Sequence, residues 1–111
     1  MKNEPTREEL LKLPRVMDTA GVPYPEKMIY IHFSFRGCSW YIAEYDDTEE
    51  KLYGFGILNN DFISAEWGYV SFNELRKFKH DNQEIARDPV FTPKPAKEID
   101  RILKCPFAFT K

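Results

Sequence analysis

The sequence predicts an α+β domain, in which an antiparallel meander of about four to five strands is accompanied by short helices at the N-terminus and in the C-terminal half. Two observations support this prediction. Apolar and aromatic residues alternate with polar residues between positions 28 and 70, with the period of two that is typical of strands. Two capping-box patterns, each followed by apolar residues at helical spacing, lie on either side of that stretch. Residues 1–111 correspond to a single domain, because no Gly- or Ser-rich linker divides them.

The first expected helix occupies residues 6–13. Thr6 and Glu9 have the spacing of a capping box, and leucines follow at the positions of an apolar face. Pro14 ends or kinks this helix, because proline has no backbone N–H to donate.

The first two expected strands, residues 28–35 and 38–45, form a hairpin around a short turn in which Gly37 can supply a positive φ. Strict alternation gives the second strand two different faces, with Trp40, Ile42 and Glu44 on one and Tyr41, Ala43 and Tyr45 on the other. The tyrosines, together with Tyr30 and His32, form either an exposed patch for a partner or part of the core. The choice depends on which face the helices cover.

A third strand is expected over residues 51–58 and a fourth over residues 66–70. The glycines at positions 54 and 56 either leave room for a bulky neighbour or mark a bulge. A second capping box, Ser71 with Glu74, starts a helix directly after the fourth strand. A last helix begins near Ala96 and stops before Pro106.

Charge is distributed unevenly along the chain, although the net charge is only −2. Residues 44–66 hold seven carboxylates against a single lysine, whereas residues 72–111 hold nine basic and six acidic side chains. Such asymmetry indicates either a polarised binding surface or two solvated segments. Because affinity for phosphates comes from clustered Lys and Arg, we do not expect direct binding to nucleic acid.

Composition also bounds the cellular setting. No run of 18 apolar residues occurs and the first ten residues lack an apolar signal-peptide core, so we expect neither a membrane span nor secretion. Cys38 and Cys105 are too few and too far apart to staple a secreted mini-protein, which favours a reduced, cytoplasmic location. We expect no cofactor and no bound metal, because the sequence has no Gly-rich phosphate loop, nucleophile elbow or His-rich cluster.

Glu44 is the first candidate for a functional side chain, since the expected strand places its charge beside apolar residues, where it needs a partner. Arg87 is the expected partner of Glu44 or Glu66, because a guanidinium suits a carboxylate, and Phe91 is expected to pack into the core. The pair either pins the C-terminal segment to the sheet or forms a ligand site. The candidate binding residues are Tyr41, Glu44, Tyr45, Glu66, Tyr69, Arg87 and Asp88.

Five segments occur in an order and spacing that match a known pattern: residues 13–14, 40–44, 55–56, 66–75 and 86–95. Over residues 13–99 the chain resembles the bacterial domain-of-unknown-function family 2958. It departs from the family pattern by a shorter acidic hairpin after Glu44, by Trp67 in place of an aliphatic residue, and by Pro89. The resemblance implies a small cytosolic accessory protein of bacteria or of plasmids, phages and other mobile elements. It carries over no catalytic residue.

Hypotheses from different classes of function remain open. The one we favour is a non-enzymatic protein-interaction module with an unidentified protein partner, existing by itself as a monomer or a weak homodimer. An alternative is a small metal-dependent hydrolase or nuclease that uses Glu44, Asp46 and Glu66 with a divalent ion. The genetic context of the family suggests a further hypothesis, a nucleic-acid-linked accessory or anti-defence protein.

Overall fold

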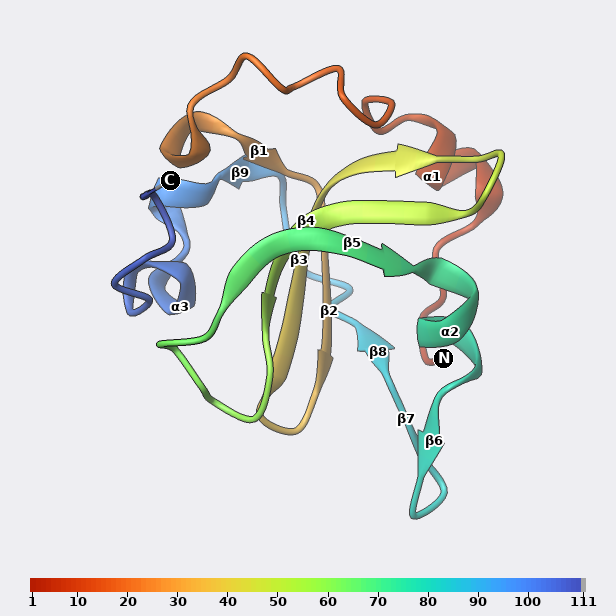
Figure 1. Cartoon of the computed structure of the whole chain (residues 1–111). Coiled ribbons are helices and arrows are strands. Elements are labelled where there is room, and N and C mark those ends of the chain that lie inside the picture. The colour runs from red at the N-terminus through yellow and green to blue at the C-terminus, as the bar shows by residue number, and fades with distance from the viewer. Residues whose placement is uncertain (111) are drawn as a thin grey trace.

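A five-stranded antiparallel sheet with the strand order β5-β4-β3-β2-β8 forms the centre of the molecule, and short helices lie at its two ends (Figure 1). The computed structural model describes residues 1–110. The predicted α+β class is therefore confirmed. In chain order the elements are α1 (Arg7–Leu11), η1 (Tyr24–Glu26), β1 (Met28–Ile29), β2 (Ile31–Phe35), β3 (Cys38–Asp46), β4 (Lys51–Ile57), β5 (Glu66–Ser71), α2 (Phe72–Lys77), β6 (Lys79–His80), β7 (Gln83–Glu84), β8 (Ala86–Arg87), β9 (Lys94–Pro95), η2 (Ala96–Glu98) and α3 (Asp100–Leu103).

Both predicted helix starts are present. The Thr6 side chain accepts a hydrogen bond from the amide of Glu9, and the Glu9 carboxylate accepts one from the amide of Thr6. Ser71 likewise accepts from the amide of Glu74 at the start of α2. These bonds satisfy amides that the first turn of a helix leaves without partners, which explains why such short helices begin where they do.

A β-bulge interrupts the pairing of β3 with β4. Ile42 lies opposite Gly54 and Glu44 lies opposite Tyr53, so Ala43 is an extra residue without a cross-strand partner. Because one extra residue shifts the alternation by one position, Glu44 turns to the face that carries Tyr53. Strict alternation had placed Glu44 on the face of Trp40 and Ile42, and that prediction is wrong.

Of the two roles that the sequence suggested for the glycines of β4, the one at a bulge is confirmed at Gly54. A Cβ at Gly54 would lie 2.0 Å from the carbonyl oxygen of Tyr41, where the bulged strand comes close, so only glycine fits. A Cβ at Gly56 would instead meet the indole of Trp40 at 3.7 Å, an ordinary contact. Gly54 is therefore required at the bulge, whereas position 56 has room for a Cβ beside the indole.

Both faces of the sheet are covered. On one face the α3 core packs η2 and α3 against strand residues that include Ile29, Tyr41, Phe55 and Ile57. On the other face the α1–α2 core packs both helices against strand residues that include Phe33, Ile42, Tyr45 and Leu52. Tyr41 is 3% exposed and Tyr45 is 1% exposed. Of the two interpretations of the tyrosines, the exposed patch is wrong for this pair, which belongs to the core.

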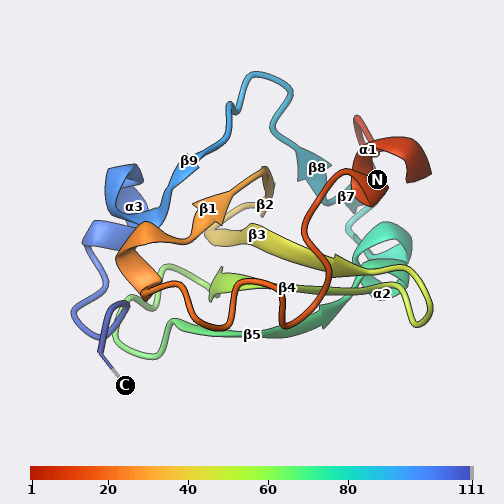
Figure 2. The same ribbon diagram turned by 90° about the horizontal axis from the view of Figure 1, so that it is seen from above.

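The two edges of the sheet differ. At β8 the backbone of Lys2 fills the outer side, since its amide donates to Ile85 and its carbonyl accepts from the amide of Arg87. At β5 no segment of the described chain lies alongside, and the strand forms the outer border of the sheet (Figure 2). One edge is therefore closed and the other is open.

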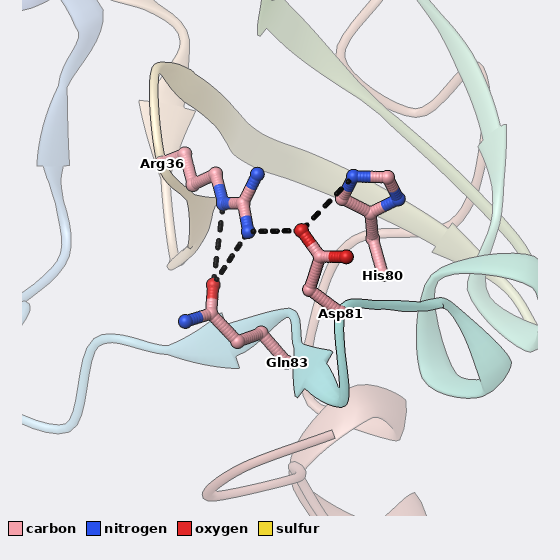
Figure 3. Close-up of polar contacts among 4 residues, drawn as sticks. All are labelled: Arg36, His80, Asp81 and Gln83. Atoms are coloured by element: carbon pink, nitrogen blue, oxygen red, sulfur yellow. Dashed lines mark hydrogen bonds and ion pairs between the residues drawn. The ribbon is translucent and has the colours of Figure 1, made fainter.

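Turn geometry corrects one further expectation. Arg36, and not Gly37, has the positive φ in the β2–β3 turn, at 51°. A Cβ at position 37 would lie 2.8 Å from the side-chain nitrogen of Asn60, so a larger residue there would require that side chain to shift. The Arg36 guanidinium donates to Asp81 at 3.2 Å and to Gln83 at 3.0 Å, and His80 faces the same aspartate (Figure 3). This exposed cluster ties the turn to the β6–β7 hairpin.

Replacing the glycine at the bulge tests this account of the sheet. We expect Gly54→Ala to lower the free energy of unfolding by about 3 kcal/mol, because its methyl group would collide with backbone atoms that cannot rotate away. Gly68 is the direct cross-strand partner of Gly54, and a Cβ there meets nothing within 4 Å. Gly68→Ala should stay within about 0.5 kcal/mol of the wild type. Urea unfolding measures both, and equal effects would contradict the bulge assignment.

Candidate functional site

The open strand β5 lies between two recesses, one on each face of the sheet. The tyrosine recess, about 380 Å³, lies on the face of the α3 core and is lined among others by Met17, Val22, Tyr24, Glu44, Tyr53 and Tyr69. The glycine recess, about 460 Å³, lies on the opposite face and is lined among others by Trp40, Gly54, Gly56, Asp61, Glu66 and Gly68. Two of the predicted residues, Glu44 and Tyr69, meet in the first recess, and Glu66 lies in the second.

Glu44 holds one wall of the tyrosine recess in place. Its side chain is buried, with the residue only 3% exposed, and its carboxylate accepts hydrogen bonds from the amides of Met17 at 2.9 Å and Thr19 at 3.0 Å. The hydroxyl of Thr19 donates to the same carboxylate. Residues 12–23, which connect α1 with η1 across β4 and β5, are thereby fastened to the sheet (Figure 2).

Lys27 is a part of this site that the sequence did not reveal. It is 3% exposed, and its ammonium donates to the hydroxyl of Thr19 at 3.0 Å and to the carbonyl of the same residue. A buried lysine needs such acceptors because burial without them is costly. Its position in the proline-containing segment just before β1 gave no sequence signal, because lysines are usually exposed.

Met17 presents an apolar side chain at the mouth of the tyrosine recess. Its φ is 79°, a conformation that a residue with a side chain adopts only when its surroundings hold it there. The bond from its amide to Glu44 supplies that restraint. The side chain itself is exposed, and its sulfur lies 3.9 Å from the hydroxyl of Tyr69.

The opposite wall of the tyrosine recess is aromatic. The rings of Tyr53 and Tyr69 lie 5.1 Å apart, and Tyr24 stacks on Trp67 at 5.0 Å. Burial, followed by the neighbouring hydroxyl of Tyr24, raises the pKa of Tyr53 to about 12. Tyr53 therefore keeps its proton at neutral pH. Tyr69 is 55% exposed, so its ring is available to a partner.

The glycine recess has a backbone floor and an acidic rim. Gly54 and Gly68 are direct cross-strand partners, so two adjacent strands lack a side chain at the same place. Asp61 and Glu66 lie at the rim, and within residues 1–110 no basic side chain lines the recess. The amide of Ser64, followed by other bonds from this loop, lowers the pKa of the Asp61 carboxyl, which keeps the group ionised.

Two residues of β5 direct their backbone groups away from the sheet. The amide of Phe72 donates to the carbonyl of Glu50 at 2.9 Å, so these two residues form a hydrogen-bonded pair of the antiparallel ladder. This pair identifies which of the other pairs between β4 and β5 are hydrogen-bonded. Because bonded and non-bonded pairs alternate, the N–H and C=O groups of Trp67 and Tyr69 point outward. No backbone group of the described chain bonds to them on that side.

Arg87 and Asp88 lie away from both recesses. Arg87 binds Glu9 of α1 at 2.8 Å, so the predicted pairing with Glu44 or Glu66 is wrong. The cause is the backbone of Lys2, which runs beside β8 and brings the start of α1 over the arginine. The amide of Thr6, and then Arg87, lower the pKa of Glu9. Phe91 is half-buried and packs against the α3 core, as expected.

Asp88, His32 and Ser39 contact one another in the same sequence, carboxylate to imidazole to hydroxyl, as the catalytic triad of a serine hydrolase. Nδ1 of His32 lies 3.5 Å from Asp88, and Nε2 lies 3.1 Å from the hydroxyl of Ser39. Ser39 is only 3% exposed, and Tyr41 stacks on the imidazole at 4.4 Å. The Ser39 hydroxyl is buried, and this arrangement satisfies the polar groups around it.

The carboxylates that the metal hypothesis requires do not converge. Glu44 is buried on the Tyr53 face, Glu66 is exposed on the opposite face, and Asp46 accepts from the amide of Thr48 in the β3–β4 turn. Among residues 1–110 no group of three or more His, Cys, Asp or Glu side chains is gathered in a way that could hold a metal ion.

Comparison of the chain with protein-family models, with curated proteins and with solved structures finds no match. Within the described residues no helix is long and apolar enough to cross a membrane.

Removing the Glu44 carboxylate tests its role in holding the 12–23 loop. We expect Glu44→Ala to cost about 3 kcal/mol of stability, because three partly buried donors lose their acceptor. Hydrogen exchange at the amides of Met17 and Thr19 should accelerate at the same time. Glu49→Ala removes an exposed carboxylate that pairs with Lys51, and it should change stability by less than about 1 kcal/mol. Unchanged exchange at both loop amides in Glu44→Ala would contradict the role.

The buried imidazole predicts a pH dependence of stability. Burial lowers the pKa of His32 below its ordinary value of 6.5, although Asp88 opposes the shift. The unfolded chain therefore binds this proton more tightly, so stability is fully present above pH 6.5 and is lost as the pH falls through the lower, folded-state value. Urea unfolding of His32→Gln should show a weaker loss between pH 7.5 and 5.5 than the wild type. The control His80→Gln should retain the wild-type loss, and an unaltered slope in His32→Gln would refute the assignment.

Proposed function

We propose that this chain is a non-enzymatic protein-interaction module that binds an extended segment of a partner protein along β5. One observation supports the proposal above all others: an open strand with outward backbone groups at Trp67 and Tyr69 and a recess on each face. An added strand would bond to those groups, as in other cases of recognition by strand addition.

The two recesses suit the geometry of such a segment. Successive side chains of a strand point to opposite faces, so neighbouring residues of the partner would enter the tyrosine recess and the glycine recess in turn. Several exposed apolar side chains of the protein gather at these recesses, namely Met17, Val22, Leu58 and Tyr69. The partner would cover surface that is otherwise unfavourably exposed to water.

The composition of β5 suits a strand that pairs with a partner, because β5 lacks most of the residues that guard an edge against pairing. Proteins usually guard an exposed edge with lysine, proline or a covering segment. Along β5 only Glu66 is charged, and no proline occurs. The protein by itself is proposed to be a monomer or a weak homodimer.

The sequence resemblance adds a cellular setting to this proposal. The resemblance to domain-of-unknown-function family 2958 suggests an accessory role in bacteria or mobile elements, although comparison with family models finds no match. Both cysteines are free, which agrees with a cytoplasmic site of action. The acidic rim formed by Asp61 and Glu66 weighs against nucleic-acid phosphates as the ligand of this surface.

Blocking the edge tests the proposal. The probe is a synthetic library of ten-residue peptides, from which the wild type should select binders that shift the amide NMR signals of Trp67 and Tyr69. Tyr69→Pro removes one outward N–H and should weaken a selected peptide at least about tenfold relative to Tyr69→Val, which loses the ring but keeps the N–H. Unfolding curves confirm that both variants fold.

A complementary measurement alters the peptide instead of the protein. N-methylation at alternate residues of the peptide should abolish binding where the N–H meets β5, and should leave it intact at the residues between. A library without any binder, or equal affinity of Tyr69→Pro and Tyr69→Val together with indifference to N-methylation, would overturn the proposal.

A further inference from the structure

The glycine recess begins at the edge strand itself. Gly68 lies between Glu66 and Val70 on the same face of β5, and no atom lies within 4 Å of the position that its Cβ would occupy. Gly54, the cross-strand partner of Gly68, extends this space without side chains across β4. The backbone of β3 at Tyr41 closes the inner end of the space. A side chain from a strand added beside β5 can therefore lie over Gly68 and reach inward, which it could not do over a larger residue.

The acidic rim and the indole wall of the glycine recess favour a positively charged group at the tip of that side chain. Asp61 and Glu66 are both exposed carboxylates, and within residues 1–110 no basic residue lines the recess. The indole of Trp40 forms part of the wall, and the face of an indole attracts cations. A long side chain with an apolar stem and a positive end meets all three features, and only lysine and arginine have that form.

We infer that the partner segment carries a lysine or arginine at the residue opposite Gly68, with its stem over the glycines and its charge between the acidic rim and Trp40. The inference rests on the proposed function, because it needs the segment to pair with β5. The residues on either side of this cation face the tyrosine recess. They are apolar or aromatic, since they meet Met17, Val22 and Tyr69.

Other occupants of the recess match it less well. The β5 strand of a second copy contains no lysine or arginine, so self-pairing would bring no cation to the rim. Phosphate groups would face two carboxylates. A bare metal ion would compete for Asp61 with the amides of Ile63 and Ser64, which already donate to this carboxylate.

The experiment uses a peptide selected from the library described above and exchanges its central cation. We expect replacement of that lysine or arginine by alanine to weaken binding to the wild type at least about tenfold. Glu66→Lys should weaken the cationic peptide similarly and should improve binding of a peptide with glutamate at the centre. Glu49→Lys makes the same change of charge in the β3–β4 turn, outside the recess, and should leave the preference intact. Gly68→Val fills the gap and should remove the preference between lysine and alanine.

The outcomes separate this inference from the proposed function. Peptides that shift the amides of Trp67 and Tyr69 but show no preference for a central cation would overturn the inference and leave strand addition standing. Equal weakening by Glu66→Lys and Glu49→Lys would also overturn it, because the attraction would then be a general effect of net charge. Binding of a single-stranded oligonucleotide in place of a basic peptide would contradict both.

Discussion

The β-bulge at Ala43 is the constraint on which the rest of the structure depends. By shifting the alternation of β3, it turns Glu44 toward Tyr53 and sends Tyr45 into the core of the opposite face. The bulge needs a glycine across from it, because the backbone of Tyr41 occupies the space of a side chain at position 54. The same irregularity therefore shapes both recesses. The tyrosine recess contains the redirected Glu44 carboxylate, and the glycine recess lies where Gly54 has no side chain.

Polar contacts hold the part of the loop that lines the tyrosine recess. Leu13 anchors the start of the loop in the α1–α2 core, but Met17 and Val22, which line the recess, are exposed, so burial of apolar surface contributes little to their position. Glu44 and Lys27 both hold the loop through Thr19, whose hydroxyl accepts from the ammonium and donates to the carboxylate. Charges of this kind set geometry more than net stability, because their removal from water offsets much of their attraction.

The sequence predicted the main strands and the helix starts, but it did not predict contacts between residues that are far apart in the chain. Period-two alternation located the strands, and the capping boxes located α1 and α2, because both signals are local. The partner of Arg87 was missed since Glu9 lies 78 positions away and no local pattern places α1 over β8. Glu44, Glu66 and Tyr69 do line the recesses, whereas Tyr41 and Tyr45 are core. The face of Glu44 was wrong because a bulge is invisible to an alternating pattern, although the glycine at position 54 was a sign of it.

The closed edge at β8 has a consequence for assembly. A sheet with two open edges can add copies of itself without limit, which is the route to fibres. Here the backbone of Lys2 occupies the far edge, so another chain that paired with β5 would find no second place to continue. Two copies joined through their β5 strands would each present only a covered β8 edge on the outside, so self-pairing of the sheet stops at two molecules. The topology thus limits edge-to-edge assembly of this chain to a pair and blocks the route to fibres.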